Sequence, residues 1–580
     1  MKNRVSKTGT PPAAPPGSNL FLPFGLVGLG ALIIAGVVYR PALHGAFVFD
    51  DLALPFELTN GEAPLAAWLS GVRPVLMLSY WINHALSSDP FGYHLVNVMI
   101  HAFNTSMVFL ILRRLLTLVR WPPRRVHLYS LIGAAIFLVH PLATESVSYI
   151  AGRSESLAAA LALAAYVWFL ERREVEVRWG DATGIVVLFA LAVAAKENMA
   201  ALAAVLLLTD WVFPRAGTRR VYLLLAPGAA FAATLIVRAL LHGGNAGFSV
   251  REFTWYQYGF TQLRALFVYA RMAVLPVGLS VDHDFPISYS IFQHASWLCG
   301  GALVVLTLLA FRKRRSYPLA FFGLLMFLIL LAPTSSVVPI ADALVERRMY
   351  LPLMGLILIG CEVAARLRVS PPFAWSLIAS LLLALCILTW DRNVLWGHPE
   401  QLLASAALQS AHNPRPVANL TEALIADNRC SQALPWLERA ERLLPYNQVI
   451  EASWGRTLEC LGRREEALAR IRTAVQIHPT SKLLELMGLL YGEMGQMDAA
   501  GAALREAVKM DPGAGSAHRS LALWYEATLR LTGAAAEYRA ALAVDSYDRK
   551  AELGLARVQA LAKEQAQRAP ERPQPTATVP

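Results

Sequence analysis

Residues 20–395 consist of long apolar segments separated by short polar connections. An apolar run of about 20 residues is long enough to cross a bilayer as a helix. The first run, Leu20–Tyr39, lacks a cleavage pattern of small residues, so we expect a retained span rather than a signal peptide. Ten further spans are predicted near residues 94–116, 127–143, 154–170, 183–196, 197–213, 220–241, 295–311, 318–332, 348–365 and 373–390.

The basic residues predict the orientation of these spans. Lys2, Arg4 and Lys7 place residues 1–19, a segment rich in Pro, Gly and Ser that we expect to be disordered, in the cytoplasm. The loop 41–93 then lies outside. Its only basic residue is Arg73, against five carboxylates. Its mixed segment 65–85 predicts short helices at the membrane surface.

Residues 262–278 are ambiguous because Arg264 and Arg271, seven residues apart, share one helical face. If this segment crossed the membrane, the basic cluster 312–315 would lie outside, against the positive-inside rule. We therefore expect a partly inserted or interfacial helix, and eleven crossings in all. The loops 279–294 and 333–347 and the C-terminal part then lie outside, on the side of Asp50 and Asp51.

Residues 400–563 change to a soluble, helical, Ala- and Leu-rich pattern that repeats. Pro445, Pro479, Pro512 and Ser546 recur at intervals of 33 or 34 residues. This period and its small residues are those of tetratricopeptide repeats, and they predict four helix pairs stacked in a solenoid. One unit shows the pattern at Leu484, Met487, Gly488, Tyr491, Ala500, Leu504, Ala507 and Pro512. The tail 564–580, rich in Gln, Pro and Thr, is predicted to be disordered.

The composition agrees with a membrane protein: 56% of residues are hydrophobic and 16% are charged, which excludes an ordinary soluble protein. The net charge of +11 reflects basic connections between spans rather than a nucleic-acid groove. The excess of arginine over lysine and the abundant alanine indicate a bacterial source with a GC-rich genome. A disulfide between Cys430 and Cys460 requires an oxidising compartment, and no spacing rule predicts it.

Ionisable residues at the predicted external ends of the spans are the candidates for chemistry, because charge near a membrane is costly. Each has an alternative structural role as a helix-end charge or in an ion pair, such as Lys196 with Glu197. His94 and His101 lie two helical turns apart, too far for easy shared metal ligation, and we do not favour a metal site. The candidates are Asp50, Asp51, His94, His101, His140, Glu145, Arg153, Lys196, Glu197, Asp282, Glu346, Arg347 and Arg348.

In order along nearly the whole chain, short motifs and the C-terminal repeats resemble the transmembrane-and-tetratricopeptide-repeat O-mannosyltransferases, a family of the GT-C glycosyltransferase superfamily, and their bacterial relatives. The chain departs from the family in its short array of repeats and in His283 at the middle of Asp282–Asp284. The matching stretches are Phe47–Asp51, Arg73-Pro74, Ser79–Trp81, Tyr93–Val98 with His101, His140–Glu145, Ala151–Ser154, Lys196-Glu197, Leu279–Asp282 and Glu346–Pro352.

This resemblance implies an all-α protein, with a GT-C-type membrane domain at 20–395 and the repeats at 400–563 on the periplasmic side of a bacterial inner membrane. It implies transfer of a sugar, mannose-like, with inversion, from a polyprenyl-phosphate carrier to an acceptor that the repeats recruit, such as a protein Ser/Thr hydroxyl. By analogy Asp50 or Asp51 is the base, and Arg347 or Arg348, with Arg153 and Lys196 as further candidates, binds the carrier phosphate.

No metal or cofactor is required, since arginine can stabilise a departing phosphate, although the two aspartates could hold a divalent ion. Three alternatives remain at this point: a polysaccharide- or lipid-modifying transferase of the same fold, a non-catalytic membrane anchor for the repeats, and a transporter. One span would suffice for an anchor, and the chain shows no inverted repeat of the kind that transporters have.

Overall fold

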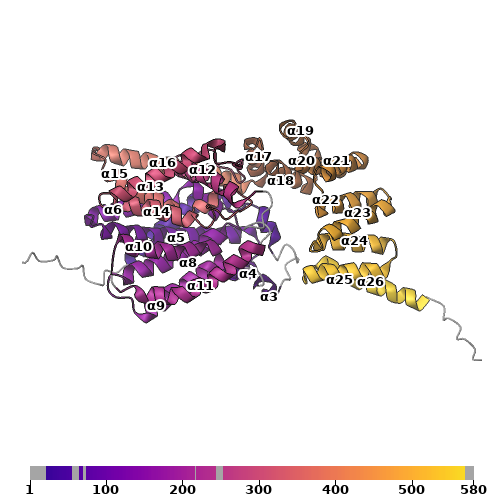
Figure 1. Ribbon diagram of the computed structural model, residues 1–580, viewed down its shortest axis with the longest axis horizontal. Helices are drawn as coiled ribbons and strands as arrows, with labels where there is room; N and C mark the ends of the chain where they lie inside the picture. Colours follow the sequence, from indigo (N-terminus) through magenta and orange to yellow (C-terminus); the bar gives the residue numbers. More distant parts are fainter. Residues whose placement is uncertain (1–20, 55–63, 70–72, 216, 243–252, 569–580) are drawn as a thin grey trace, which may run out of the picture.

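The computed structural model describes residues 21–54, 64–69, 73–215, 217–242 and 253–568. The expected disorder of residues 1–19 lies outside this part. Helices account for nearly all regular structure in the described ranges. Figure 1 shows them as a bundle of long helices with a curved stack of helix pairs beyond one of its ends.

The bundle contains the apolar helices that the hydrophobic segments predict. Pro90 and Asp89 begin α5, where the Asp89 carboxylate accepts a hydrogen bond from the backbone N–H of Phe91 at 2.8 Å. The helices are α1 (Phe21–Val38), α5 (Pro90–Leu118), α6 (Pro123–Leu138), α8 (Arg153–Arg172), α9 (Trp179–Ala195), α10 (Ala201–Val212), α11 (Arg219–His242), α12 (Trp255–Val274), α13 (Ser296–Lys313), α14 (Pro318–Leu331), α15 (Leu353–Ala364) and α16 (Pro371–Gly397).

Among the described helices, four are long and apolar enough to cross a bilayer: α5, α8, the segment Gln293–Lys313 that contains α13, and α16. A fifth span results if α6 and the bent segment Pro141–Val147 count as one. Others, such as the 12-residue α10, are shorter than the roughly 30 Å of hydrocarbon that a helix must cross at 1.5 Å per residue. Central α5 is mostly buried, whereas α13 and α16 leave most of their apolar surface exposed, as expected for helices that face lipid.

Short helices connect the bundle helices at the end that faces the repeats. The predicted surface helices of loop 41–93 correspond to α3 (Leu65–Leu69) and α4 (Pro74–Leu86). The other short elements at this end are the 3-10 helices η2 (Phe49–Ala53), η3 (Pro141–Ala143), η4 (Glu197–Ala200) and η6 (Glu346–Met349), and the single turn α7 (Thr144–Val147).

Residues 262–274 of the segment 262–278 form the C-terminal part of α12, and the helix ends at Val274. This helix of 20 residues is not among the four apolar candidates for a span. It packs against α13 and α15. Arg271 is exposed, and the guanidinium of Arg264 donates to the backbone oxygen of Pro286 at 3.0 Å. Whether α12 enters the membrane stays a prediction.

The C-terminal part contains antiparallel helix pairs. α18 (Arg415–Ala426), α20 (Gln448–Cys460), α22 (Ser481–Glu493) and α24 (Gly515–Ala527) begin at intervals of 33 or 34 residues. Their partners are α19 (Leu434–Leu443), α21 (Arg464–Ile477), α23 (Met497–Met510) and α25 (Leu531–Val544). The first pair follows α17 (Pro399–Gln409), and α26 (Arg549–Arg568) covers the last.

Glycine allows close contact within each of two pairs. A Cβ at Gly455 would lie 2.4 Å from the side chain of Ile471, and one at Gly488 would lie 2.6 Å from that of Leu504. Both contacts join the two helices of one pair, which is why the repeat pattern needs a small residue there.

Two details differ from, or add to, the expectations for this part. α26 continues to Arg568, so the first five residues of the expected disordered tail, 564–568, are helical, because residues 563–568 (KEQAQR) are good helix formers without Pro or Gly. Residues 569–580 lie outside the described part. Cys430, in the 3-10 helix η7 (Cys430–Ala433), and Cys460, at the end of α20, form a disulfide, with their Cα atoms 6.1 Å apart.

Candidate functional site

Asp50 and Asp51 follow α1 on a short 3-10 turn, and the structure gives them different surroundings. The Asp51 side chain is buried, and its carboxylate accepts hydrogen bonds from the backbone N–H groups of Val48 at 3.1 Å and Ala151 at 2.7 Å. Asp50 is exposed, and its backbone N–H donates to the Tyr149 hydroxyl at 2.8 Å. Asp51 therefore ties this loop to the turn before α8, while the Asp50 carboxylate stays accessible.

The loop is wedged between the bundle and the first repeat helices. Phe49 has a φ of 51°, a strained conformation for a large side chain, and its ring meets that of Tyr149 edge-on. The other face of Tyr149 stacks on Trp396 of α16, with ring centroids 5.6 Å apart. Phe49 also packs against the apolar cluster that includes Leu403 of α17. This packing holds the strained backbone that places Asp50.

Burial also changes the acidity of these groups. It raises the pKa of Asp51 to about 7, although the two backbone N–H groups oppose the shift. Burial likewise raises the pKa of the Tyr149 hydroxyl, and the nearby Asp51 adds to this shift, while Arg347 lies close enough to oppose it. Tyr149 thus stays protonated and stands between the aspartates and the cations described next.

Six charged side chains gather at this end of the bundle in three ion pairs. Arg347 binds Glu145 twice, through its backbone N–H at 2.8 Å and its guanidinium at 2.5 Å. The other two pairs are Arg73 with Glu197, at 2.6 Å, and Lys196 with Glu155, at 2.6 Å. We call Arg73, Glu145, Glu155, Lys196, Glu197 and Arg347 the open cluster.

Two pairs of the open cluster reach solvent and one is buried. The side chains of Arg347 and Arg73 are 27% and 34% exposed, whereas that of Lys196 is 10% exposed. The sequence suggested that Lys196 and Glu197 neutralise each other. That interpretation is wrong: the chain turns between them, so Lys196 points to Glu155 of α8 and Glu197 to Arg73 of the first loop.

A second group of charges lies where the repeats meet the bundle. Arg415 of α18 forms hydrogen bonds to both carboxylate oxygens of Asp282, at 2.5 and 2.6 Å, and to the carboxylate of Asp342, at 2.7 Å. Arg348 donates to the backbone oxygen of Asp342 at 2.7 Å. We call Asp282, Asp342, Glu346, Arg348, Arg392 and Arg415 the junction cluster.

Glu346 anchors the junction cluster from within. Its buried carboxylate accepts hydrogen bonds from the backbone N–H of Ser280 at 2.6 Å and from His283 at 2.9 Å, and it lies 3.5 Å from Arg392. Burial opposes ionisation, but Arg392 and His283 outweigh it and lower the pKa of Glu346. The neighbours Arg347 and Arg348 thus belong to different clusters. The sequence alone gives both as equal candidates for binding the carrier phosphate.

The guanidinium of Arg153 makes its contacts inside the protein. Its guanidinium donates to Asn97 at 2.6 Å, to Asn83 at 2.8 Å and to the backbone oxygen of Tyr93 at 2.9 Å, and it lies 4.7 Å from the ring centre of Tyr80. The side chain is completely buried. Because it is buried and bonded to these groups, Arg153 does not reach a phosphate at the surface of the site.

The three candidate histidines are bonded to the backbone. His94 contacts the carbonyl of Gly45 at 3.1 Å, His101 that of Leu138 at 3.0 Å, and His140 that of Ala273 at 3.0 Å. They join segments of the bundle that lie far apart in the sequence. In the described ranges no three His, Cys, Asp or Glu side chains are grouped as metal ligands.

Several residues described above were not among the sequence candidates: Arg73, Tyr149 and Glu155 at the open cluster, and Asp342, Arg392 and Arg415 at the junction cluster. Arg73 stands in a motif that carries the family resemblance, so the sequence could have identified it as a candidate. Tyr149 and Glu155 offered no signal, because their roles depend on contacts with Asp50 and Lys196 that no local pattern encodes.

Several proteins of known name are similar to this chain. No family model matches the chain. It is 35% identical over 194 residues to protein O-mannosyl-transferase Tmtc1 of Drosophila melanogaster, which covers 30% of this chain and 21% of that protein. It is 24% identical to protein O-mannosyl-transferase F38B6.6 of Caenorhabditis elegans, over 69% of this chain and 60% of the relative. Identity to TMTC3 of Mus musculus is also 24%, over 77% of this chain and 54% of the relative.

The chain thus spans between about a fifth and three fifths of the length of these relatives. Among solved structures, it is similar to the tetratricopeptide protein YrrB (TM-score 0.23, 16% identity, 28% of this chain and 84% of that one) and to yeast Tom70 (TM-score 0.28, 11% identity, 72% and 94%). At these scores the structural likenesses carry no argument. The named relatives are all protein O-mannosyl-transferases.

Proposed function

We propose that this chain is a GT-C-type, inverting membrane glycosyltransferase, which moves a mannose-like hexose from a polyprenyl-phosphate carrier to a protein Ser/Thr hydroxyl. The observation that carries the proposal is the pairing of an accessible carboxylate, Asp50, with solvent-reaching arginines at the same end of the bundle. Transfer from a phosphate carrier needs both a base for the acceptor and cations for the leaving group. The relatives named as protein O-mannosyl-transferases support the reaction class.

In this proposal Asp50 is the base and Asp51 positions it. The Asp50 carboxylate takes the proton of the acceptor hydroxyl as the acceptor oxygen bonds to the anomeric carbon. The bond from that carbon to the phosphate oxygen breaks, and its electron pair stays on the phosphate. Attack from the side opposite to the phosphate inverts the anomeric centre. Asp51 cannot serve equally well, because both of its oxygens are bonded to backbone N–H groups.

Arg347 and Arg73 would bind the carrier phosphate. Glu145 engages the backbone N–H and one guanidinium nitrogen of Arg347, which leaves the rest of the guanidinium for two oxygens of a phosphate. Burial disfavours the charge, yet Glu145 raises the pKa of Arg347, so the cation persists in a partly desolvated site. Lys196, which is paired with Glu155, adds positive electrostatic potential to this site. In this proposal the reaction requires no metal ion or other cofactor.

The proposal includes a membrane topology and a cellular location for the chain. Residues 20–395 form the membrane domain, with about eleven crossings, and residues 400–563 form four repeats that recruit the acceptor. We place the repeats and the open cluster in the periplasm, with the chain in a bacterial inner membrane. The disulfide between Cys430 and Cys460 supports this side, since disulfides persist in the periplasm and are rare in the cytosol.

The proposal is tested with the purified full-length chain in nanodiscs, a panel of radiolabelled polyprenyl-phosphate sugars, and membrane and periplasmic extracts as acceptor. We expect label from one hexose donor to enter a protein and to be released by alkaline β-elimination, as an O-linked sugar on Ser or Thr is. Label in a polysaccharide or lipid would instead establish the alternative transferase, and no transfer from any donor would contradict the proposal.

A further inference from the structure

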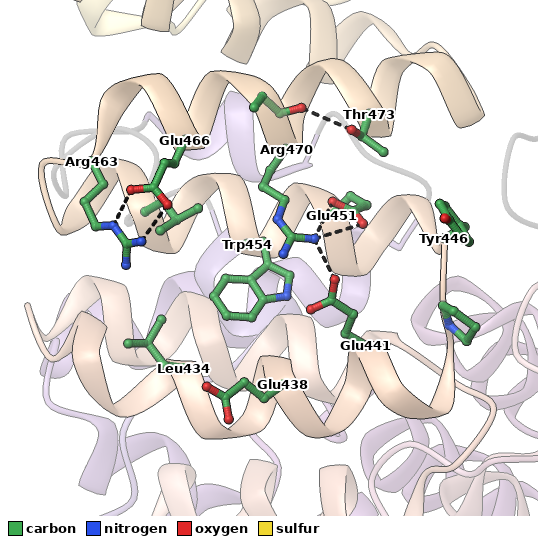
Figure 2. Close-up of a pocket in the computed structure, with 13 residues that line it drawn as sticks. Leu434, Glu438, Glu441, Tyr446, Glu451, Trp454, Arg463, Glu466, Arg470 and Thr473 are labelled. Atoms are coloured by element: carbon green, nitrogen blue, oxygen red, sulfur yellow. Dashed lines mark hydrogen bonds and ion pairs between the residues drawn. The ribbon is translucent and has the colours of Figure 1, made fainter.

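The repeats contain a groove between α19 and α21, with α20 as its floor. Its volume is about 840 Å³, within the range of about 300–1,000 Å³ that is usual for ligand sites. Figure 2 shows Glu438 and Glu441 on the α19 side, Trp454 on the floor, and Arg463, Glu466 and Arg470 on the α21 side. The groove is open to solvent rather than enclosed, so it can admit a segment of a larger molecule.

The groove carries excess negative charge. Arg470 is shared by two carboxylates, Glu441 at 2.7 Å and Glu451 at 3.1 Å, so one guanidinium faces two anions. Arg463 and Glu466 neutralise each other at 2.5 Å. Glu438 has no ion-pair partner among the described residues. The lining therefore has a surplus of about two negative charges on the α19 side, which attracts a cationic ligand.

The floor offers an unused hydrogen-bond donor. Trp454 is 8% exposed, and its indole Nε1 has no acceptor within the part of the chain that the structure describes. Buried indole N–H groups normally have a partner. Figure 2 shows this nitrogen on the side of the ring where Glu441 lies. A backbone carbonyl of a peptide in the groove would supply the missing acceptor.

The walls of the groove are fixed in advance. The disulfide joins Cys430, in the turn that leads into α19, to Cys460 at the end of α20. Arg470 lies over the Trp454 ring, 5.0 Å from its centre, and ties α21 to the floor. A site that is rigid before binding loses less conformational entropy when a ligand enters.

We propose that this groove binds an extended, basic peptide segment of a protein partner. A Lys or Arg side chain of the peptide lies between Glu438 and Glu441, and a neighbouring peptide carbonyl accepts from Trp454 Nε1. The inference rests on the proposed function in one respect: it gives the chemistry of the protein segment that the repeats would present to the transferase site.

Binding is measured without any sugar transfer, so this inference and the proposed function fail separately. The full-length chain in nanodiscs is titrated into a fluorescein-labelled peptide of alternating lysine and serine, and fluorescence anisotropy is recorded. A peptide of alternating glutamate and serine is the matched probe. We expect saturable binding of the lysine peptide, weakened by added salt, and little binding of the glutamate peptide.

Two variants locate the binding site. Glu438→Gln, an exposed position, removes half of the surplus charge and should weaken binding of the lysine peptide about fivefold. Trp454→Phe removes the indole N–H together with part of the ring surface, and should weaken binding at least as much. Glu465→Gln is the matched control, since Glu465 lies on α21, carries the same charge and does not line the groove.

The proposal is checked by the folding of the variants and by three binding outcomes. Thermal unfolding of each variant verifies that the repeats remain folded. Equal binding of the lysine and glutamate peptides would overturn the proposal, as would wild-type affinity in both Glu438→Gln and Trp454→Phe. Loss of binding in Glu465→Gln to the same extent would also overturn it, because the effect would then be one of general charge.

Discussion

The open cluster and the junction cluster contain the same kinds of residue, three cations and three carboxylates each, and they differ in what holds them. In the junction cluster, Glu346 is buried under a backbone N–H, a histidine and an arginine, and Arg415 bridges two carboxylates from separate loops. In the open cluster, Arg347 and Arg73 each have one carboxylate partner and reach solvent. Charged side chains whose hydrogen bonds are all made within the protein hold the loops together. Arginines with N–H groups that remain unpaired can bind a phosphate.

Arg347 and Arg348 show the difference between two adjacent residues. η6 turns between them, so one guanidinium enters the open cluster at Glu145 and the other packs beneath Asp342. The short helix therefore links the proposed phosphate site to the contact with the repeats. Substitutions in the two clusters should therefore have different consequences.

The largest effect is expected at the buried pair of the open cluster. Glu155→Gln leaves the Lys196 ammonium without its carboxylate, and breaking a buried ion pair costs about 3–5 kcal/mol of folding free energy. The double variant Glu155→Leu/Lys196→Leu should recover most of this stability. Thermal unfolding in nanodiscs measures both. A Glu155→Gln variant as stable as the wild type would show that Lys196 is not confined as described.

Arg347→Gln should lower kcat/KM for sugar transfer about 10²–10³-fold, because a cation that faces the departing phosphate is lost. Arg348→Gln, one residue away, should leave kcat/KM within about threefold, since Arg348 points to the junction. Transfer assays with one labelled donor compare the two. Equal losses in both variants would remove the distinction between the clusters.

The stability of the first loop should depend on pH through Asp51. Its pKa is about 7 in the folded protein and about 3.9 in an unfolded chain, so the folded state binds the extra proton between these values. This contribution is present below about pH 4 and is lost as the pH rises through about 7, at about 1.4 kcal/mol per pH unit at most. The melting temperature of the wild type should therefore fall more steeply over this window than that of Asp51→Asn. Parallel pH profiles would contradict the assignment.

The smallest effect is expected at the junction. The Arg415 side chain is half exposed, so Arg415→Gln should cost about 1 kcal/mol or less. It should loosen the repeats from the bundle, which protease cleavage between residues 398 and 414 would report as a faster rate. Arg456→Gln, which breaks an exposed pair with Glu422 within the repeats, is the control and should leave that rate unchanged.

The elements of this molecule differ in how far the sequence predicts them. The 33- and 34-residue spacing predicts the helix pairs because each pair is a local unit, and Gly488 marks the contact with Leu504 in advance. The apolar runs predict the helices, but they do not predict which helices cross the membrane. For example, α10 has only 12 residues, too few to cross the bilayer by itself. Among the site residues, Asp50 and Arg347 follow from motifs. The partners of Lys196, Arg153 and Arg348 do not, because each is set by contacts between segments far apart in the chain.

The most direct test of the central claim separates donor binding from catalysis at Asp50. In nanodiscs, Asp50→Asn should bind the labelled polyprenyl-phosphate hexose within about threefold of the wild-type affinity, because Arg347 and Arg73 remain, yet turnover should fall about 10²–10⁴-fold. Asp51→Asn serves for comparison and should retain more activity while its folded loop is less stable, because an amide cannot accept from both backbone N–H groups. Full turnover in Asp50→Asn would show that this carboxylate is not the base, and would contradict the account of the site.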